Sequence, residues 1–411
     1  MRRRLPAVAA LAAALLGPLA ATPAHAAPAQ APPPPASVTP RLPAPGGPHP
    51  VGLTTLHLQD QGRPDPWVPG ERRELMVSLW YPAAKPSGTR APYMTAAEST
   101  AYLTANEIPL PPDTLTTVVT HSTVDAPPAR TRAKFPLVVL SPGFGMPRAT
   151  LTGLAEELAS RGYAVAAVGH NHEADGITFP DGHTTGCAVC DDPDYPKVGD
   201  VRAADVSFVL DELTGARPAW RHGRLVDGGR VAMVGHSAGG FSTIPALLRD
   251  PRVKAGVNMD GNFRYPNDKP VPRPVLMLGK PSHVPGGPDP TWDRTWKQLT
   301  GWKRWLSVDG TEHGSFTDTA PLGGQVGIPG QDLDGERCAA LTRAYVTAFA
   351  DRHLRGRSAP LLDGPSARYP EVRFHQPAPE RGDQPVAERG DRPAPDAREP
   401  VPGGLVTGVR R

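Results

Sequence analysis

One stretch of the sequence decides the fold: Val231-Ala-Met-Val-Gly235-His236-Ser237-Ala238-Gly239-Gly240. An apolar, strand-like run leads directly into the pattern G-x-S-x-G, and a helical pattern follows over residues 241–248. The glycines two positions before and after Ser237 leave room for a turn so sharp that the serine adopts strained backbone angles. The stretch therefore predicts a strand, a tight turn and a helix, with the serine hydroxyl presented at the carboxyl end of a buried strand.

On both sides of this turn, short apolar runs alternate with helical patterns. Such alternation is typical of an α/β fold, in which a mostly parallel central sheet carries helices on both faces. The expected strands are residues 53–58, 75–81, 137–140, 164–168, 231–234, 255–259, 275–278 and 305–308. The expected helices, besides 241–248, are residues 150–161, 202–213 and 336–354. Residues 93–124 break this rhythm and are interpreted as an insertion over the rim of the sheet, where it could act as a lid.

Composition divides the 411 residues into a folded centre and two proline-rich flanks. Residues 1–26 have the pattern of an export signal, because Arg2, Arg3 and Arg4 precede an apolar run that ends in Ala-His-Ala. That run is interrupted by a proline and is shorter than the roughly 20 residues of a spanning helix, so we expect no transmembrane segment. We expect a disordered Pro/Ala-rich leader at 27–48, the catalytic domain at 49–364 and a disordered, charged, Pro-rich tail at 365–411.

The charge and the cysteines exclude some classes of function. The formal net charge is only +3 and the basic residues are scattered, so we expect no nucleic-acid partner. Three cysteines, Cys187, Cys190 and Cys338, fit an exported protein with one disulfide and one remaining thiol, although the sequence does not tell which two pair. A lone C-x-x-C without a second pair favours a structural bridge over a zinc or redox site. The tail contains Arg-Gly-Asp twice, a tripeptide that arises easily in a segment so rich in these residues.

A serine hydroxyl is a weak nucleophile, so it needs a histidine that takes its proton and an acid that orients the imidazole. His313 is the expected base, because it lies in a glycine-containing loop directly after the last expected strand. His353 falls within a helical pattern and comes too late in the chain. The sequence therefore predicts Ser237 as the nucleophile and His313 as the general base.

Two aspartates compete for the role of the acid. Asp260 ends the apolar run of the strand after the turn, whereas Asp289 follows the next strand in a loose Pro-Gly-Gly-Pro-Asp-Pro loop. The later strand is the more usual position, but Asp260 stands at a strand end released by Gly261, where a catalytic carboxylate is expected. We favour Asp260 over Asp289, the alternative being that Asp260 is a capping or surface aspartate.

During acyl transfer the carbonyl oxygen of the substrate gains a negative charge, and this oxyanion needs two hydrogen-bond donors directed at it. One is expected from the backbone N–H of Ala238, directly after the nucleophile, and the other from the backbone N–H of Phe144, which lies between two glycines after an earlier strand. The alternative for these glycines is an ordinary tight turn.

A second cluster of polar residues follows the expected strand 164–168. It consists of His170, His172, Glu173 and Asp175, residue types that bind metals, but no distant partner has recognisable ligand spacing. A loop that lines the rim of the active site explains the cluster as well. We therefore expect neither a metal nor a cofactor.

Together these motifs resemble the type II branch of the platelet-activating-factor acetylhydrolase family, within the α/β-hydrolases. The resemblance covers about residues 51–354 and rests on the motifs at 79–82, 135–145, 158–168, 208–213 and 234–240, and on His313 with Phe316 after it. In that family the triad acid ends the strand that follows the nucleophile, which implies the set Ser237, Asp260 and His313, with Phe144 as the early oxyanion donor. Pro142 departs from the family, which usually has histidine before the oxyanion glycine.

The resemblance implies a secreted serine ester hydrolase with the α/β-hydrolase fold that acts through an acyl-enzyme without a metal or cofactor. Its expected substrates are short-acyl esters or the sn-2 acyl group of phospholipids, and its expected partner is this small-molecule ester or lipid, with transient contact to a lipid surface. The alternatives are a general secreted lipase or polyester-degrading esterase and, from another class, a catalytically inert secreted binding or adhesion protein.

Overall fold

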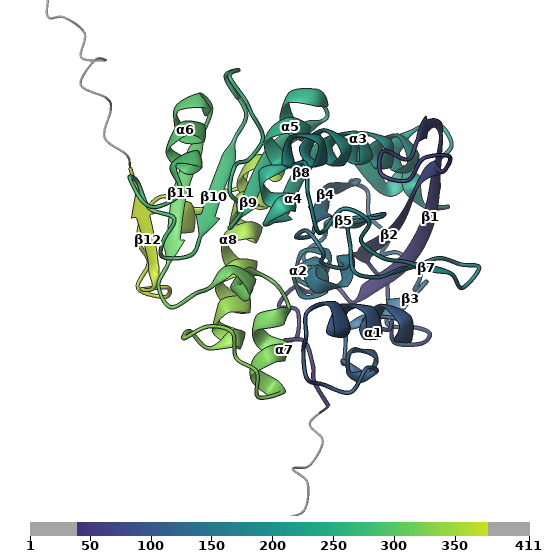
Figure 1. Cartoon of the computed structure of the whole chain (residues 1–411). Helices are drawn as coiled ribbons and strands as arrows, with labels where there is room; N and C mark the ends of the chain where they lie inside the picture. Colours follow the sequence, from purple (N-terminus) through teal and green to yellow (C-terminus); the bar gives the residue numbers. More distant parts are fainter. Residues whose placement is uncertain (1–38, 377–411) are drawn as a thin grey trace, which may run out of the picture. The chain divides into compact units, whose positions relative to one another are not determined.

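The structure is a computed structural model, and it describes residues 39–376 (Figure 1). The predicted export signal and both Arg-Gly-Asp tripeptides lie outside the described residues. Across residues 39–376, no helix combines the length and the apolar character that crossing a membrane requires.

The described residues form strands and helices in alternation. The strands are β1 Val51–Pro64, β2 Arg72–Pro82, β3 Ser122–Val124, β4 Phe135–Ser141, β5 Ala164–His170, β6 Ile177–Thr178, β7 Thr184–Thr185, β8 Val226–His236, β9 Val253–Met259, β10 Val275–Gly279, β11 Lys303–Val308 and β12 Val372–His375. The α-helices are α1 Ala96–Ala105, α2 Thr152–Ser160, α3 Tyr195–Thr214, α4 Ala238–Phe241, α5 Thr243–Arg249, α6 Pro290–Gln298, α7 Thr319–Gln325 and α8 Gly335–Arg355. Every strand expected from the sequence is present, and the expected helices correspond to α2, α3, α5 and α8.

Within the described residues, ten strands form one sheet in the order β12-β11-β10-β9-β8-β4-β5-β2-β1-β3. The six central strands from β11 to β5 run parallel, whereas β12 pairs antiparallel with β11, and β2 pairs antiparallel with both β5 and β1. In Figure 1 the sheet runs from β12 on the left to β1 on the right. The chain therefore has the α/β-hydrolase fold, and the predicted fold class is confirmed.

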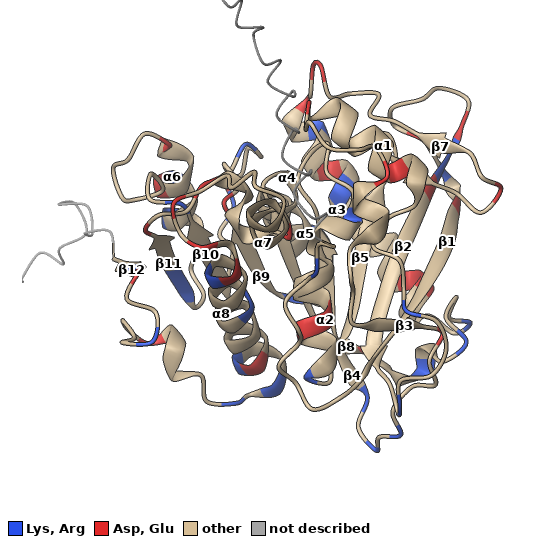
Figure 2. Ribbon diagram, turned by 90° about the horizontal axis from the view of Figure 1, so that it is seen from below, with Lys and Arg blue, Asp and Glu red and all other residues tan. Residues whose placement is uncertain are grey.

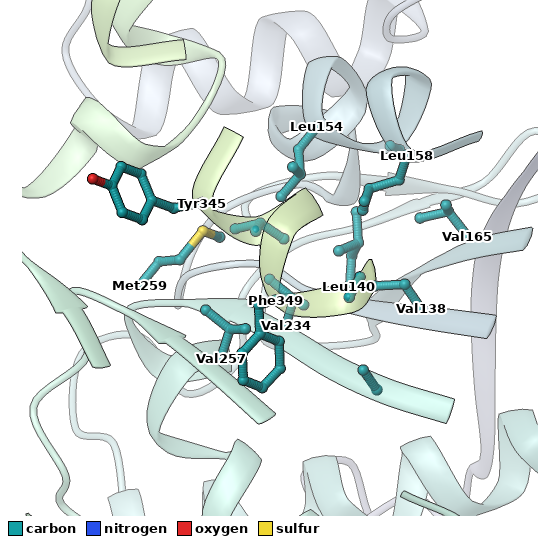
Figure 3. Close-up of a cluster of buried hydrophobic side chains, with 14 of the residues drawn as sticks. Val138, Leu140, Leu154, Leu158, Val165, Val234, Val257, Met259, Tyr345 and Phe349 are labelled. Carbon is teal, nitrogen blue, oxygen red and sulfur yellow. The ribbon is translucent and has the colours of Figure 1, made fainter. Parts of the chain in front are cut away.

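Alternate side chains of the strands pack against helices on opposite faces, because successive residues of a strand point to opposite sides. On one face, the buried side chains of the parallel strands pack against Leu154 and Leu158 of α2 and against Tyr345 and Phe349 of α8 (Figure 3). On the other face, the neighbouring strand residues pack against α3, α5 and α6. Burial on both faces explains why these strands are continuous apolar runs in the sequence.

The domain extends further at both ends than the boundaries 49 and 364 predicted from the sequence. Residues 39–48 were assigned to a disordered leader, but Leu42 is only 1% exposed and its backbone N–H donates to the carbonyl of Val119. The predicted tail likewise begins with ordered residues, because β12 pairs with β11. Ordered residues thus lie beyond both predicted boundaries. The first segment is rich in proline and the second is a four-residue strand, so neither shows a hydrophobic period.

The insertion at 93–124 contains α1 and ends in β3. The helix begins with a reciprocal cap, in which the Thr95 side chain accepts from the backbone N–H of Glu98 and the Glu98 side chain accepts from that of Thr95. Tyr102 and Leu103 of α1 are buried in one cluster with Leu322 of α7. The insertion is thus a packed subdomain against α7, and its last residues extend the sheet edge next to β1, which the sequence did not predict.

Figure 2 shows basic and acidic residues interspersed over the described elements, in agreement with the scattered charge of the sequence. Cys187 and Cys190 form a disulfide, and Cys338 is a buried free thiol. The C-x-x-C pair is therefore the bridge that the sequence could not identify.

Candidate active site

Ser237 lies at the turn between β8 and α4, as predicted. Its φ of 54° lies in the left-handed region, which a residue other than glycine adopts only under strain. The flanking glycines allow this turn: a Cβ on Gly235 would lie 2.1 Å from the carbonyl carbon of Gly239, and a Cβ on Gly239 would lie 2.0 Å from the carbonyl oxygen of Ser141. The backbone can therefore turn sharply enough to present the serine hydroxyl only with glycine at both positions.

The structure brings Ser237, His313 and Asp260 together in a continuous hydrogen-bonded series. The distance from His313 Nε2 to Ser237 Oγ is 2.9 Å, and the distance from His313 Nδ1 to Asp260 Oδ2 is 2.6 Å. His313 begins a short 3-10 helix, His313–Phe316, after β11, and Asp260 directly follows β9. These residues come from three separate carboxyl ends of parallel strands, which meet at one edge of the sheet.

Asp260 is fully buried and accepts three hydrogen bonds. Besides His313 on Oδ2, its Oδ1 atom lies 2.8 Å from His283 Nδ1 and 2.7 Å from the backbone N of Lys280. Burial alone would raise the pKa of Asp260, but the hydrogen bonds from His283 and His313 lower it to about 2. The carboxylate is therefore ionised at neutral pH.

His283 was missed by the sequence analysis. Its Nε2 atom lies 3.5 Å from Asp289 Oδ2, an ion-pair distance, and its ring stacks on Trp292 with 4.3 Å between the ring centroids. Burial lowers the pKa of His283, but Asp260 and Asp289 outweigh burial and raise it to about 8. The two aspartates that competed for the acid position are thus linked through one histidine, with Asp260 in contact with His313. A histidine in the loop after β10 was the available signal, since that strand end lies at the same edge of the sheet.

The two predicted oxyanion donors lie beside Ser237. Phe144 and Ala238 line the same cavity as Ser237, and neither backbone N–H donates a hydrogen bond to another residue within the described range. The loop that carries Phe144 is held by Gly145, whose N–H donates to the carbonyl of Glu173 at 2.9 Å. Two backbone N–H groups with no partner among the described residues therefore belong to residues that line the cavity of Ser237.

Arg202 of α3 holds this loop in place through hydrogen bonds. Its Nη1 atom donates to the carbonyl oxygen of Pro142 at 2.6 Å, and its Nε atom donates to Glu173 Oε2 at 2.7 Å. Arg202 and Glu173 are each about 1% exposed. A buried, paired arginine thus fixes the loop on which Phe144 lies, a role that no motif in the sequence indicates.

The polar cluster after β5 is part of the same buried network. His170 contacts Asp205 Oδ2 at 2.8 Å and Ser141 Oγ at 2.9 Å, and burial together with Arg202 lowers the pKa of His170. Arg73 pairs with Asp205 at 2.6 Å. Within residues 39–376, no group of three or more His, Cys, Asp or Glu side chains has an arrangement that could hold a metal. His170 and Glu173 thus engage in ion pairs and hydrogen bonds beneath the oxyanion loop.

A cavity of about 500 Å³ opens over Ser237. Three aromatic side chains, Phe144, Tyr195 and Phe241, form part of its wall, and Arg264, Lys280, Asp260 and Asp289 are charged residues that also line it. Ser237 therefore lines a mixed aromatic and polar cavity of a size that holds small molecules.

Comparison with known proteins gives three main findings. A family model described as "Platelet-activating factor acetylhydrolase, isoform II" matches residues 36–185. A solved structure titled "Ferulic acid esterase from Streptomyces cinnamoneus" is 45% identical, with a TM-score of 0.74, and covers 82% of this chain and 100% of its own. A curated protein from Arthroderma benhamiae, "Probable 1-alkyl-2-acetylglycerophosphocholine esterase", is 29% identical over 58% of this chain and 66% of its own length.

A further curated relative is the "Bis(hydroxyethyl) terephthalate hydrolase" of Streptomyces coelicolor, which is 28% identical over 38% of this chain and 43% of its own length. The chain thus spans less than two thirds of the length of these curated relatives, whereas it spans the whole of the solved bacterial structure.

Proposed function

Because the chain belongs to the platelet-activating factor acetylhydrolase, isoform II, family of α/β-hydrolases, we propose that it is a serine carboxylic-ester hydrolase with Ser237 as its nucleophile. The observation that carries the proposal is the continuous series of hydrogen bonds from Ser237 Oγ through His313 to Asp260. This series supplies the three groups that acyl transfer from an ester needs.

In the first half of the reaction, Ser237 Oγ attacks the ester carbonyl carbon while His313 Nε2 takes the hydroxyl proton. The imidazolium that forms is stabilised by the Asp260 carboxylate, which accepts from Nδ1. The backbone N–H groups of Phe144 and Ala238 stabilise the negative charge on the former carbonyl oxygen.

The tetrahedral intermediate then breaks down in the direction of the alcohol. His313 returns its proton to the alcohol oxygen as the bond between that oxygen and the acyl carbon breaks, leaving an acyl group on Ser237. A water molecule enters, gives a proton to His313 and attacks the acyl carbon, and Ser237 regains its proton as the carboxylic acid leaves. The chemistry needs no cofactor beyond these groups.

For the substrate, we propose esters of short acyl groups, which include acetyl esters at the sn-2 position of phospholipids, as the fungal relative's name describes for that protein. A second candidate is an ester of an aromatic acid. The aromatic wall formed by Phe144, Tyr195 and Phe241 favours it, and the bacterial relative's title names ferulic acid. A general lipase or polyester hydrolase remains the alternative, and an acyl panel separates these classes.

We also propose that the protein is exported. The support comes from the arginine-led apolar stretch at residues 1–26 and from the Cys187–Cys190 disulfide, which is expected in an oxidising compartment. N-terminal sequencing of the protein from the culture medium tests this proposal, and a start at residue 27 is the expected result.

The nucleophile is tested by labelling with a fluorophosphonate probe followed by peptide mass spectrometry. We expect the label on Ser237, its loss in the Ser237→Ala variant, and its retention in Ser282→Ala, a matched change of another serine of the same cavity. The same preparations are assayed with acetyl, octanoyl and feruloyl esters. A protein that neither takes the label nor hydrolyses any ester overturns the proposal and leaves the inert binding protein as the better interpretation.

A further inference from the structure

A second cavity, of about 290 Å³, shares His313 as a lining residue with the cavity over Ser237. One wall comes from the insertion at 93–124 and includes Tyr102 and Leu103 of α1; the other comes from α7 and the residues after it, including Leu322, Val326 and Ile328. Figure 1 shows α1 and α7 next to each other in the lower part of the view. We call this cavity the α1–α7 groove.

The groove meets the catalytic residues at His313. The lining of the groove includes Met146, His236, His313 and Gly314, whereas Ser237, Phe144 and Ala238 line only the first cavity. His313 is the residue with a proposed chemical role that lines both cavities. A carbonyl group bonded to Ser237 therefore lies in the first cavity, and the His313 imidazole marks the boundary between the two cavities.

The direction of proton transfer assigns the groove to one part of the ester. His313 Nε2 delivers its proton to the alcohol oxygen, so this oxygen lies against the imidazole when the ester bond breaks. The remainder of the alcohol must continue from that oxygen past His313. Of the two cavities that the imidazole lines, the α1–α7 groove is the one that does not hold the carbonyl group.

The lining of the groove fits an uncharged, apolar group. None of the described residues that line it is Asp, Glu, Lys or Arg, whereas the first cavity has charged residues of both signs. His236 adds no charge at neutral pH, because burial and the neighbouring His313 lower its pKa to about 4. At the rim, Ile328 is 38% exposed, one of three large hydrophobic side chains so exposed among the described residues. An apolar group of a ligand that bound there would cover this side chain and remove its apolar surface from water.

From these observations we propose that the α1–α7 groove binds the apolar alcohol portion of the ester, so that chain length is selected on the alcohol side. The proposal rests on the proposed function. It adds that the preferred substrates combine a short or aromatic acyl group with a long apolar alcohol.

The test compares two series of esters on the purified protein. In the first, acetate esters carry alcohols from ethyl to octyl; in the second, ethyl esters carry acyl groups from acetyl to octanoyl. Each methylene buried in the groove is expected to raise kcat/KM by about fourfold until the groove is filled, which corresponds to roughly 0.8 kcal/mol. We expect octyl acetate to exceed ethyl acetate by at least about tenfold, without a matching rise along the acyl series.

Two variants connect this preference to the groove. Val326→Trp places a larger side chain at a half-buried position of the wall, and Ile328→Glu adds a charge at the exposed rim, where the fold tolerates it. Both are expected to move the octyl-to-ethyl ratio of kcat/KM toward one. Leu248→Trp, a change at a leucine of α5 that is 37% exposed and lies outside the groove lining, is the matched control and should keep the wild-type ratio.

Two results overturn the inference while leaving the proposed function intact. One is a flat alcohol series in a protein that hydrolyses ethyl acetate and takes the fluorophosphonate label. The other is an acyl series that rises with length and is flattened by Val326→Trp, which would place the acyl chain in the groove. Absence of both labelling and turnover instead overturns the proposed function, and the inference with it.

Discussion

Replacing His283 by glutamine should change how the stability of the protein depends on pH. His283 is 5% exposed and its imidazole lies between two carboxylates, 2.8 Å from Asp260 Oδ1 and 3.5 Å from Asp289 Oδ2. The folded protein therefore favours the imidazolium form. Glutamine keeps an amide that can donate to Asp260 but cannot gain a proton.

The magnitude follows from the pKa of His283, which the two carboxylates raise from the ordinary 6.5 to about 8 in spite of burial. This difference corresponds to about 2 kcal/mol of folding free energy. Because the folded pKa is the higher one, the stabilisation is fully present below about pH 6.5 and is lost as the pH rises through about 8. On the acid side the same ion pair is lost when Asp260 gains a proton, between its ordinary pKa of 3.8 and its folded value of about 2.

The assay is urea unfolding followed by fluorescence at about pH 6 and pH 9. Between these two pH values, the wild-type protein should lose about 2 kcal/mol more than His283→Gln does. His49→Gln, a change of an exposed histidine near the N-terminal end of the domain, serves as the control and should behave as wild type. Equal pH dependence in wild type and His283→Gln, within about 0.5 kcal/mol, would refute the reasoning, because His283 would then carry no raised pKa.

Three further predictions follow from the site and its surroundings. Asp260→Asn should lower kcat by about 10⁴-fold and Asp289→Asn by less than about tenfold, since only Asp260 contacts His313; the reverse order in steady-state assays would contradict the acid assignment. Arg202→Met should lower the free energy of unfolding by about 2 to 3 kcal/mol in a denaturant titration, because it removes one of the two arginines that pair with the buried Glu173, and a loss below about 1 kcal/mol would count against the network around the loop that carries Phe144. Burial raises the pKa of Asp318 to about 8 despite the Gly153 N–H and Arg343, so the folded protein favours the protonated acid and loses stability as the pH rises toward 8. Asp318→Asn should therefore raise Tm at pH 9 and change it little at pH 5; an equal change at both would contradict the raised pKa.

The central strands and the turn at Ser237 could be predicted because their physical requirements impose a recognisable pattern on a few consecutive residues. A parallel strand buried on both faces is a short apolar run, and a serine in a sharp turn needs glycines at fixed spacing. The strand β12 has no such pattern in its sequence. It is held by backbone pairing with β11 and by packing across the chain, and four residues are too few to show a period.

The site was predictable where a residue directly follows a strand or lies in the short loop after it. Ser237, Asp260 and His313 were found in this way, and the structure brings them together. His283 follows β10 in the same manner, but its importance depends on Asp260 and Asp289, two partners at different distances along the chain. The choice between these aspartates likewise depended on which carboxylate reaches His313, a distance that no spacing in the sequence contains.

The segment before β1 affects where a shortened chain of this protein can begin without losing contacts of the domain. The backbone of Arg41 and the side chain of Gln325 exchange two hydrogen bonds of 2.8 Å, while the next residue, Leu42, donates to Val119. Residues 39–42 therefore connect the insertion to the end of α7 through hydrogen bonds, and so link the two walls of the α1–α7 groove. A recombinant chain that starts at His49, where the sequence alone would place the domain boundary, lacks these hydrogen bonds. Its substrate preference would report on a protein that lacks these contacts of the α1–α7 groove.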